Sequence, residues 1–378
     1  MEASKKIDIY TLSEYIEKVD SLPYANCLFR GEPALFPFCN AAGFRLERRN
    51  KEESCFPFCD LIEEFYKEVS YKISSQEKNE FIAFAQHYGI PTNLLDLTSS
   101  PLVALYFACQ PNPNSHLRAK YPNADPLCFD DIGHIYFANH FADITEYVKN
   151  IGYKNFVEYY FLQTEKELLQ LIPLFEKYRQ NYPEEFHICF KNLLETIQVV
   201  NEDMDMQNEV DDDILSYFLQ TNPDFHSIFD LANNGRYHPF DLERELDVIP
   251  MDIIAYLVNV ANFVEELKKY KTDVIETINF FPNFLYDPAL NFERGRNQQA
   301  HFLYQTHFSC YMNIWDENYA IKQELKFQDT SFRIHNKDKI LDGLDRIGIN
   351  SKTIWCDFDH TAAYIKNKYL SNPPRDKS

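Results

Sequence analysis

Five polar side chains in the largely apolar stretch Phe81–Cys109 are the first candidates for chemistry. They are Gln86, His87, Tyr88, Asp96 and Thr98. Imidazole, carboxylate, amide and hydroxyl groups can all exchange hydrogen bonds with a ligand or with the protein itself. A polar group held between buried elements must be hydrogen bonded within the protein or serve a functional site. The sequence leaves both alternatives open.

The helix that carries His87 is predicted from the same stretch. Residues Phe81–Tyr88 have the apolar spacing of a helix. Gly89 suits the position just past a helix end, and Pro91 blocks continuation of the helix.

A short strand and a second helix are predicted next. If Asn93–Thr98 is a strand, Asp96 and Thr98 point to one face because they lie two residues apart. Ser100–Pro101 then supplies a hydroxyl cap and a proline at the first helical position. The following helix, Leu102–Cys109, is apolar nearly all round, so we expect it to be buried.

An arginine and a glycine end an earlier predicted strand, Asn26–Gly31. Gly31 would let the backbone approach a ligand or another strand closely. Arg30 could contact a ligand, or it could form a structural ion pair with Asp96.

Two further arginines are candidates. Arg45 ends a loop that is rich in proline and aromatic residues, and Arg294 lies close to Gln298 on one late element. Each could face a ligand or solvent.

Composition indicates a folded protein of 378 residues, with 45% hydrophobic and 16% aromatic residues and room for one or two domains. The net charge of −21 argues against an extensive nucleic-acid surface, because phosphate contacts dominate that affinity. The motifs GxGxxG and GxxxxGK[ST] are absent from the sequence, so we expect neither a standard dinucleotide loop nor a P-loop.

The nine cysteines contain no CxxC pair, and we see neither an apolar signal core nor a run long enough to span a bilayer. We therefore expect a cytoplasmic protein with reduced thiols and no membrane partner. No metal is expected. The CxxxC pair Cys55 and Cys59 is interpreted as small buried hydrophobes, and the acidic run Asn201–Asp213 lacks the glycine of an EF-hand loop.

The fold class predicted from these patterns is α+β with a large helical insertion. Residues 1–144 would form the N-terminal part of the core, 145–280 the helical insertion, and 281–378 the C-terminal part. Within the last part, Ser351–Trp355 is predicted to be a strand.

Three motifs together resemble the FRG domain. They are LFRG at Leu28–Gly31, AQHYGIPTNLLDLTSSPLVALYFA at Ala85–Ala108, and RxxxQQAxF at Arg294–Phe302. The closing stretch Lys337–Tyr369 is similar to the end of that family. The resemblance therefore reaches from one end of the chain to the other.

A weaker resemblance is to the ADP-ribosyltransferase plan. Its order is an aromatic-Arg-Gly strand, a Thr/Ser strand that leads into an apolar helix, and a polar residue on a late strand. It implies small mixed or antiparallel sheets around a central cleft, with NAD as the substrate. The implied nucleotide-binding residues are Arg30, Gly31, Arg45, His87, Tyr88, Asp96 and Arg294. The implied catalytic residues are Gln298 and Thr98.

These resemblances imply an ADP-ribosyltransferase or an NAD glycohydrolase that acts on an unknown macromolecular acceptor, in a bacterial antiviral defence or toxin system. Whether the chain is an enzyme stays open, because Gln298 is neutral where a glutamate would stabilise positive charge better. The alternatives are a non-catalytic module that binds a nucleotide or nucleic acid, and a regulatory partner of another protein.

Overall fold

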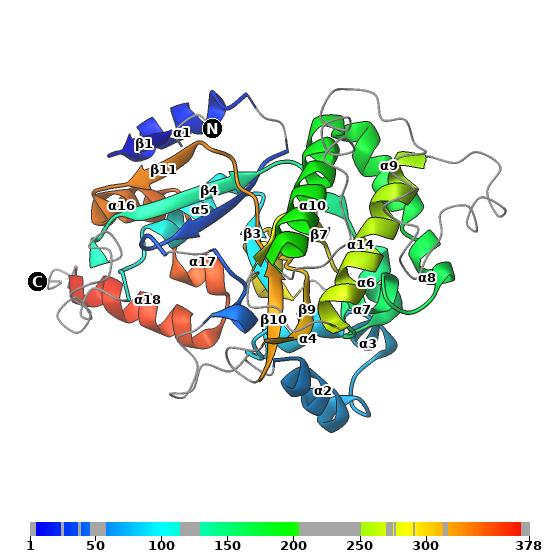
Figure 1. Cartoon of the computed structure of the whole chain (residues 1–378). Coiled ribbons are helices and arrows are strands. Elements are labelled where there is room, and N and C mark those ends of the chain that lie inside the picture. The colour runs from blue at the N-terminus through cyan, green and yellow to red at the C-terminus, as the bar shows by residue number, and fades with distance from the viewer. Residues whose placement is uncertain are drawn as a thin grey trace, which may run out of the picture.

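The structure is a computed structural model (Figure 1). It describes residues 5–23, 26–36, 39–45, 58–113, 129–203, 251–269, 275, 277–289, 292–312 and 317–371. The fold is of the α+β type with mixed sheets, as predicted. Cys55 and most of the acidic run, from Met204 to Asp213, lie outside the described residues.

The strands, in chain order, are β1 (Lys6–Ile9), β2 (Leu28–Glu32), β3 (Leu94–Thr98), β4 (Gly133–Ala138), β5 (Ala142–Asp143), β6 (Thr277–Ile278), β7 (Phe284–Tyr286), β8 (Ala300–Tyr304), β9 (His307–Met312), β10 (Glu317–Gln323) and β11 (Ser331–Ile334). Within the described residues, one sheet has the order β1-β11-β4-β2-β3-β8-β7-β5 and a smaller one has the order β6-β10-β9. The central strand β2 is antiparallel to both of its neighbours, β4 and β3, and β3 is antiparallel to β8.

The helices of the N-terminal third are α1 (Leu12–Asp20), the 3-10 turn η1 (Ala42–Phe44), α2 (Phe58–Val69), α3 (Ser75–Asn79), α4 (Phe81–His87) and α5 (Pro101–Ala108). The later helices are α6 (Thr145–Ile151), α7 (Phe156–Tyr160), α8 (Glu165–Leu169), α9 (Ile172–Asn181), α10 (Pro183–Asp203), α14 (Met251–Lys269), α15 (Glu293–Asn297), α16 (Lys337–Arg346), α17 (Ser351–Trp355) and α18 (Phe358–Ser371). None of the described helices is long and apolar enough to cross a membrane.

Helices α1, α5, α16 and α17 cover one face of the strands β1, β11, β4 and β2, with which they share a buried apolar cluster. The buried helix α5 begins as its sequence predicts, because Ser100 Oγ accepts a hydrogen bond from Val103 N and proline follows the cap. Two glycines let α5 approach the sheet. A Cβ on Gly31 would lie 1.8 Å from Ala104 O, and one on Gly133 would lie 2.2 Å from Ala108 O.

The opposite face of β2 and β3 packs against α2, α4 and η1 in a second apolar cluster. Helices α6 to α10 and α14 gather at one end of the molecule, on the right in Figure 1. Their buried side chains share a core with residues of β7, β8 and β9. The proposed division into core and insertion stays a prediction.

The predicted strand Ser351–Trp355 is wrong, because this segment is the short helix α17. Asn350 caps it: its side chain accepts from Thr353 N, and Thr353 Oγ1 in turn accepts from Asn350 N. This reciprocal capping box favours a helical turn over the extended backbone that the apolar side chains suggest.

Candidate functional site

Arg30 lies on β2 and points to the face opposite α5. Its neighbours Phe29 and Gly31 face α5, and the alternation of side chains along a strand puts Arg30 and Glu32 together on the other face. Arg30 Nε donates to Glu32 Oε1 at 2.7 Å, and Nη1 donates to the main-chain oxygen of Asp96 at 2.8 Å. Of the two alternatives for Arg30, the structural ion pair is therefore present, but its partner is Glu32 and not Asp96.

The guanidinium of Arg30 is held in its charged form. Burial by itself would lower its pKa, but the negative charges of Glu32 and Asp96 and the hydrogen bond to Glu32 outweigh burial and raise the pKa above its usual value. Cys39 completes this buried group, because its thiol lies 3.6 Å from Glu32 Oε1. Burial and the charge of Glu32 raise the pKa of Cys39 to about 12, so the thiol stays protonated at neutral pH.

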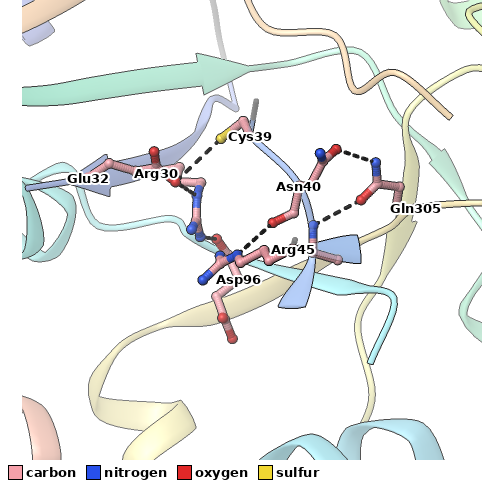
Figure 2. A network of polar contacts seen from close by, with 8 residues as sticks. Arg30, Glu32, Cys39, Asn40, Arg45, Asp96 and Gln305 are labelled. Atoms are coloured by element: carbon pink, nitrogen blue, oxygen red, sulfur yellow. Dashed lines mark hydrogen bonds and ion pairs between the residues drawn. The ribbon is translucent and has the colours of Figure 1, made fainter. Parts of the chain in front are cut away.

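Arg45 reaches the same region from η1. Its Nε donates to Asn40 O at 3.1 Å, and the side chain is otherwise exposed. The turn is fixed by Gln305, whose Oε1 accepts from Ala41 N at 2.9 Å and whose Nε2 donates to Asn40 Oδ1 at 2.9 Å. Figure 2 shows this network and the guanidinium groups of Arg30 and Arg45 in one region.

Asp96 is placed beside Arg30 by its backbone, whereas its side chain points away from the Arg30–Glu32 pair (Figure 2). The carboxylate accepts a hydrogen bond from Gln86 Nε2 at 2.9 Å, and the hydroxyl of Thr92 donates to Gln86 Oε1. These hydrogen bonds tie the end of α4 to β3. They explain part of the polar content of the central motif without a ligand.

The two candidate catalytic residues are neighbours, but the contact joins the Thr98 hydroxyl to the main chain of Gln298 and not to its side chain. Thr98 is 5% exposed, and its hydroxyl donates to Gln298 O at 2.6 Å while accepting from Ser100 N at 3.0 Å. The side-chain amide of Gln298 donates to Ile354 O at 3.3 Å. Both side chains therefore have protein partners.

Arg30 and Thr98 do not converge on one face. Thr98 is paired directly with Phe29 across β3 and β2, and directly opposite residues of neighbouring strands share a face. Phe29 packs on the α5 side, so Thr98 points there too, away from the Arg30 side chain. The backbone of β3 separates them.

The remaining predicted residues are dispersed. Helix α5 occupies the space that a Cβ of Gly31 would take, so this glycine serves the packing of α5 on β2. His87 stacks on Phe292 with ring centres 3.7 Å apart, and Tyr88 is 62% exposed beside Phe84. Burial, followed by the charge of Arg294, lowers the pKa of His87.

Arg294 is exposed on α15, with its guanidinium carbon 4.3 Å from the centre of the Trp355 ring. The protein atoms around the exposed Arg45 and Arg294 remove part of their hydration and lower their pKa, whereas the charge of Asp96 raises it for both and that of Asp357 for Arg294. On Arg45 the like charge of Arg30 adds to the lowering. Arg30, Arg45 and Arg294, here called the arginine group, are therefore all within electrostatic reach of Asp96.

Three residues of this region were missed by sequence reasoning. Glu32 could have been found, because it lies two residues after Arg30 and shares its strand face. Cys39 and Gln305 gave no local signal, since Gln305 reaches the turn at Asn40 from 265 residues along the chain. Among the residues described, the side chains of His, Cys, Asp and Glu form no group of three that could hold a metal ion.

Comparison with known proteins gives one match. No curated protein and no solved structure matches the chain. Residues 25–116 match the model of the FRG domain, and this segment contains β2, the Arg45 turn, β3 and α5. The chain therefore carries an FRG domain.

Proposed function

We propose that this protein binds a phosphate-bearing nucleotide of the NAD type through the arginine group. The proposal rests on the exposure of two guanidinium groups and on their lack of a carboxylate partner among the described residues. Arg45 and Arg294 are exposed, and neither forms an ion pair with a carboxylate in the part of the chain that is described. A guanidinium with free edges is a planar donor that suits phosphate oxygens.

The charge distribution supports an anionic ligand at this place. The chain as a whole carries −21, so most of its surface repels anions. The charge of Arg30 is largely balanced by the paired carboxylate of Glu32, whereas Arg45 and Arg294 interact with Asp96 only through their charges, and Arg294 also with Asp357. Three arginines in an acidic protein would thus offer an anionic ligand guanidinium groups that are not paired with a carboxylate of the described residues, at Arg45 and Arg294.

Cleavage of NAD is the second candidate, as an ADP-ribosyltransferase or an NAD glycohydrolase. It is favoured by the order of the strands that carry Arg30, Thr98 and the Gln298 segment, because β2, β3 and β8 are direct neighbours. Gln298 itself ends helix α15, two residues before β8, whereas the ADP-ribosyltransferase plan has its late polar residue on a strand. Breaking the bond between nicotinamide and ribose leaves positive charge on the sugar, which an oxygen of Gln298 or a carboxylate would stabilise.

Binding without turnover is the alternative that one observation favours. The amide nitrogen of Gln298 already donates to Ile354 O, and Thr98 lies on the opposite strand face from Arg30. A ligand held by Arg30 and Arg45 would thus meet neither catalytic candidate in this arrangement. The non-catalytic module and the enzyme share the arginine group and differ in turnover.

The proposal extends to the domain organisation and to the place where the protein acts. Residues 145–280 would be an insertion into a core formed by 1–144 and 281–378, and they would shape the access of an unknown macromolecular acceptor. The protein would act in the cytoplasm, in a defence or toxin system.

The binding proposal is tested by Arg45→Ala, with Arg346→Ala as the matched control. Arg346 is also exposed, but it lies on α16, which packs on the α5 face of the sheet. Calorimetric titration with ADP-ribose and with NAD should show affinity about tenfold weaker in Arg45→Ala, as expected when a charged hydrogen bond to phosphate is lost. Arg346→Ala should bind as the unchanged protein does.

Turnover is measured separately. Nicotinamide release from NAD and transfer of labelled ADP-ribose to added protein would support the enzyme, and binding without either product would support the non-catalytic module. If calorimetry detects neither NAD nor ADP-ribose binding, the proposed function is wrong.

A further inference from the structure

Arg294 lies outside the segment that matches the FRG domain, and its surroundings are built by the C-terminal helices. The guanidinium carbon lies 4.3 Å from the centre of the Trp355 ring, which is a cation–π contact. A guanidinium can stack on an aromatic ring while it binds an oxyanion. The N–H groups at its edge stay available for oxygen acceptors.

Trp355 is itself held in place from the core. Its ring meets that of Phe107 edge-on, with the ring centres 6.0 Å apart. Phe107 belongs to helix α5, most of whose residues are buried. A continuous chain of contacts therefore runs from the buried helix to the exposed guanidinium.

His360 adds a second contact to the same indole. The two rings are 4.7 Å apart and nearly parallel, at 13°. Asp357 fixes the imidazole, because its carboxylate lies 2.7 Å from His360 Nδ1 and also accepts from His360 N. These hydrogen bonds hold the pKa of Asp357 below its usual value.

The backbone around Arg294 is joined to the same turn. Gln298 Nε2 donates to Ile354 O at 3.3 Å, and Asn297 Nδ2 donates to Cys356 Sγ. Arg294, Asn297 and Gln298 are spaced as one face of a helical turn. That face contacts the end of α17 and the residue after it, through Trp355, Cys356 and Ile354. Ile354, which is 2% exposed, anchors α17 in the core.

We propose that Trp355, supported by Phe107 and His360, is the positioning residue that presents Arg294 to a phosphate of the bound nucleotide. This inference rests on the proposed function and adds the C-terminal helices to the binding site. A guanidinium whose orientation is fixed before binding loses less conformational freedom when the ligand arrives. Loss of the ring would release Arg294 into several orientations and weaken phosphate binding.

The test compares Trp355→Ala, Trp355→Phe and the exposed neighbour Phe358→Ala, which is 95% exposed on α18 and serves as the control. The probes are ADP-ribose and inorganic pyrophosphate, because pyrophosphate has phosphates but no base. Trp355→Ala should weaken binding of both probes by the same factor, about threefold, the effect of an exposed cation–π contact. Trp355→Phe keeps a ring beneath the guanidinium and should retain most of the affinity, and Phe358→Ala should change nothing.

A double substitution makes the test specific. In an Arg294→Ala background, Trp355→Ala should have no further effect on binding, and thermal unfolding shows whether each variant is folded. Weakened ADP-ribose binding with unchanged pyrophosphate binding would mean that Trp355 stacks on the base, which overturns the inference. Binding that is indifferent to Trp355 would overturn the inference alone, whereas no binding of either probe to the unchanged protein would remove the proposed function as well.

Discussion

Thr98 illustrates how a side chain that could contact a ligand can instead form hydrogen bonds with main-chain groups of the protein. Its hydroxyl joins β3 to the turn that carries Gln298 O, and it also receives Ser100 N at the start of α5. Arg45 differs, because most of its guanidinium edge has no protein partner among the described residues. Residue type alone does not separate these two cases, since both are polar and both lie next to a buried element.

The structural role of Thr98 predicts the effect of Thr98→Val. Valine has nearly the same shape, but it would leave Gln298 O and Ser100 N without their hydroxyl partner. The free energy of unfolding should fall by about 1–3 kcal/mol, as measured by urea denaturation. Thr98→Ser keeps the hydroxyl and is the matched control, which should lose clearly less. Equal stability of the valine variant and the unchanged protein would contradict this structural role.

The candidate site could be predicted from sequence only where the signal is local. The types and spacing of Arg30, Asp96 and Arg294 mark them as candidates, and the structure brings both arginines within electrostatic reach of Asp96. Gln305 could not be identified, because nothing near it in sequence shows that it fixes the turn beside Arg45. The separation of Arg30 from Thr98 also depends on strand register, which the sequence of either strand does not specify.

At the scale of elements, the best predictions were those with capping or breaking residues. The end of α4 near Gly89 and the start of α5 at Ser100 and Pro101 follow from such residues and agree with the structure. The neighbours of β2 could not be predicted, because β3 and β4 lie far from β2 in the sequence and nothing local indicates which strands pair. The strand predicted for Ser351–Trp355 is wrong because the capping box at Asn350 starts a helix there, despite the apolar residues that favour a strand.

The close contact between β2 and α5 predicts a large effect of Gly31→Ala. The added methyl carbon would lie 1.8 Å from Ala104 O, and that atom belongs to backbone that cannot rotate away. We expect a loss of about 3 kcal/mol or more in the free energy of unfolding, or failure to fold. The readout is thermal or urea denaturation of purified protein.

Gly295→Ala is the matched control for that experiment. This glycine lies in α15, nothing lies within 4 Å of the position that a Cβ would take, and its φ is not in the left-handed region. Alanine favours helix there, so stability should stay the same or rise slightly. If Gly31→Ala were as harmless as Gly295→Ala, helix α5 could not pack so closely on β2.

Across the whole molecule, two buried histidines connect stability to pH. His134 on β4 is 6% exposed and His307 on β9 is 4% exposed, and they lie in different parts of the fold. Burial lowers the pKa of His134 to about 4, with a further contribution from nearby positive charges, and burial lowers the pKa of His307 to about 4. Asn155 Nδ2 lies 3.0 Å from His307 Nε2, and Asn155 Oδ1 accepts from Glu158 N, so Nε2 is the unprotonated nitrogen.

The sign of the pH effect follows from these shifts. Between the unfolded pKa of about 6.5 and the folded pKa, the unfolded chain binds protons that the folded chain does not, so stability is complete above about pH 6.5 and falls toward pH 4. Each histidine should contribute up to about 3 kcal/mol to that loss. Carboxylates with lowered pKa, such as Asp8, act only at lower pH, because their unfolded pKa is near 4.

Urea denaturation from about pH 8 to about pH 4 tests this dependence, and the slope of stability against pH is the quantity to compare. His134→Gln and His307→Gln cannot take up the proton, so each should flatten the slope, even if the variant is less stable at pH 8. The exposed His187→Gln on α10 should leave the slope unchanged. Because the two buried histidines lie in different parts of the sheet system, their effects on the slope should add in the double variant. A slope that is the same in all variants would show that neither histidine is kept neutral by the fold.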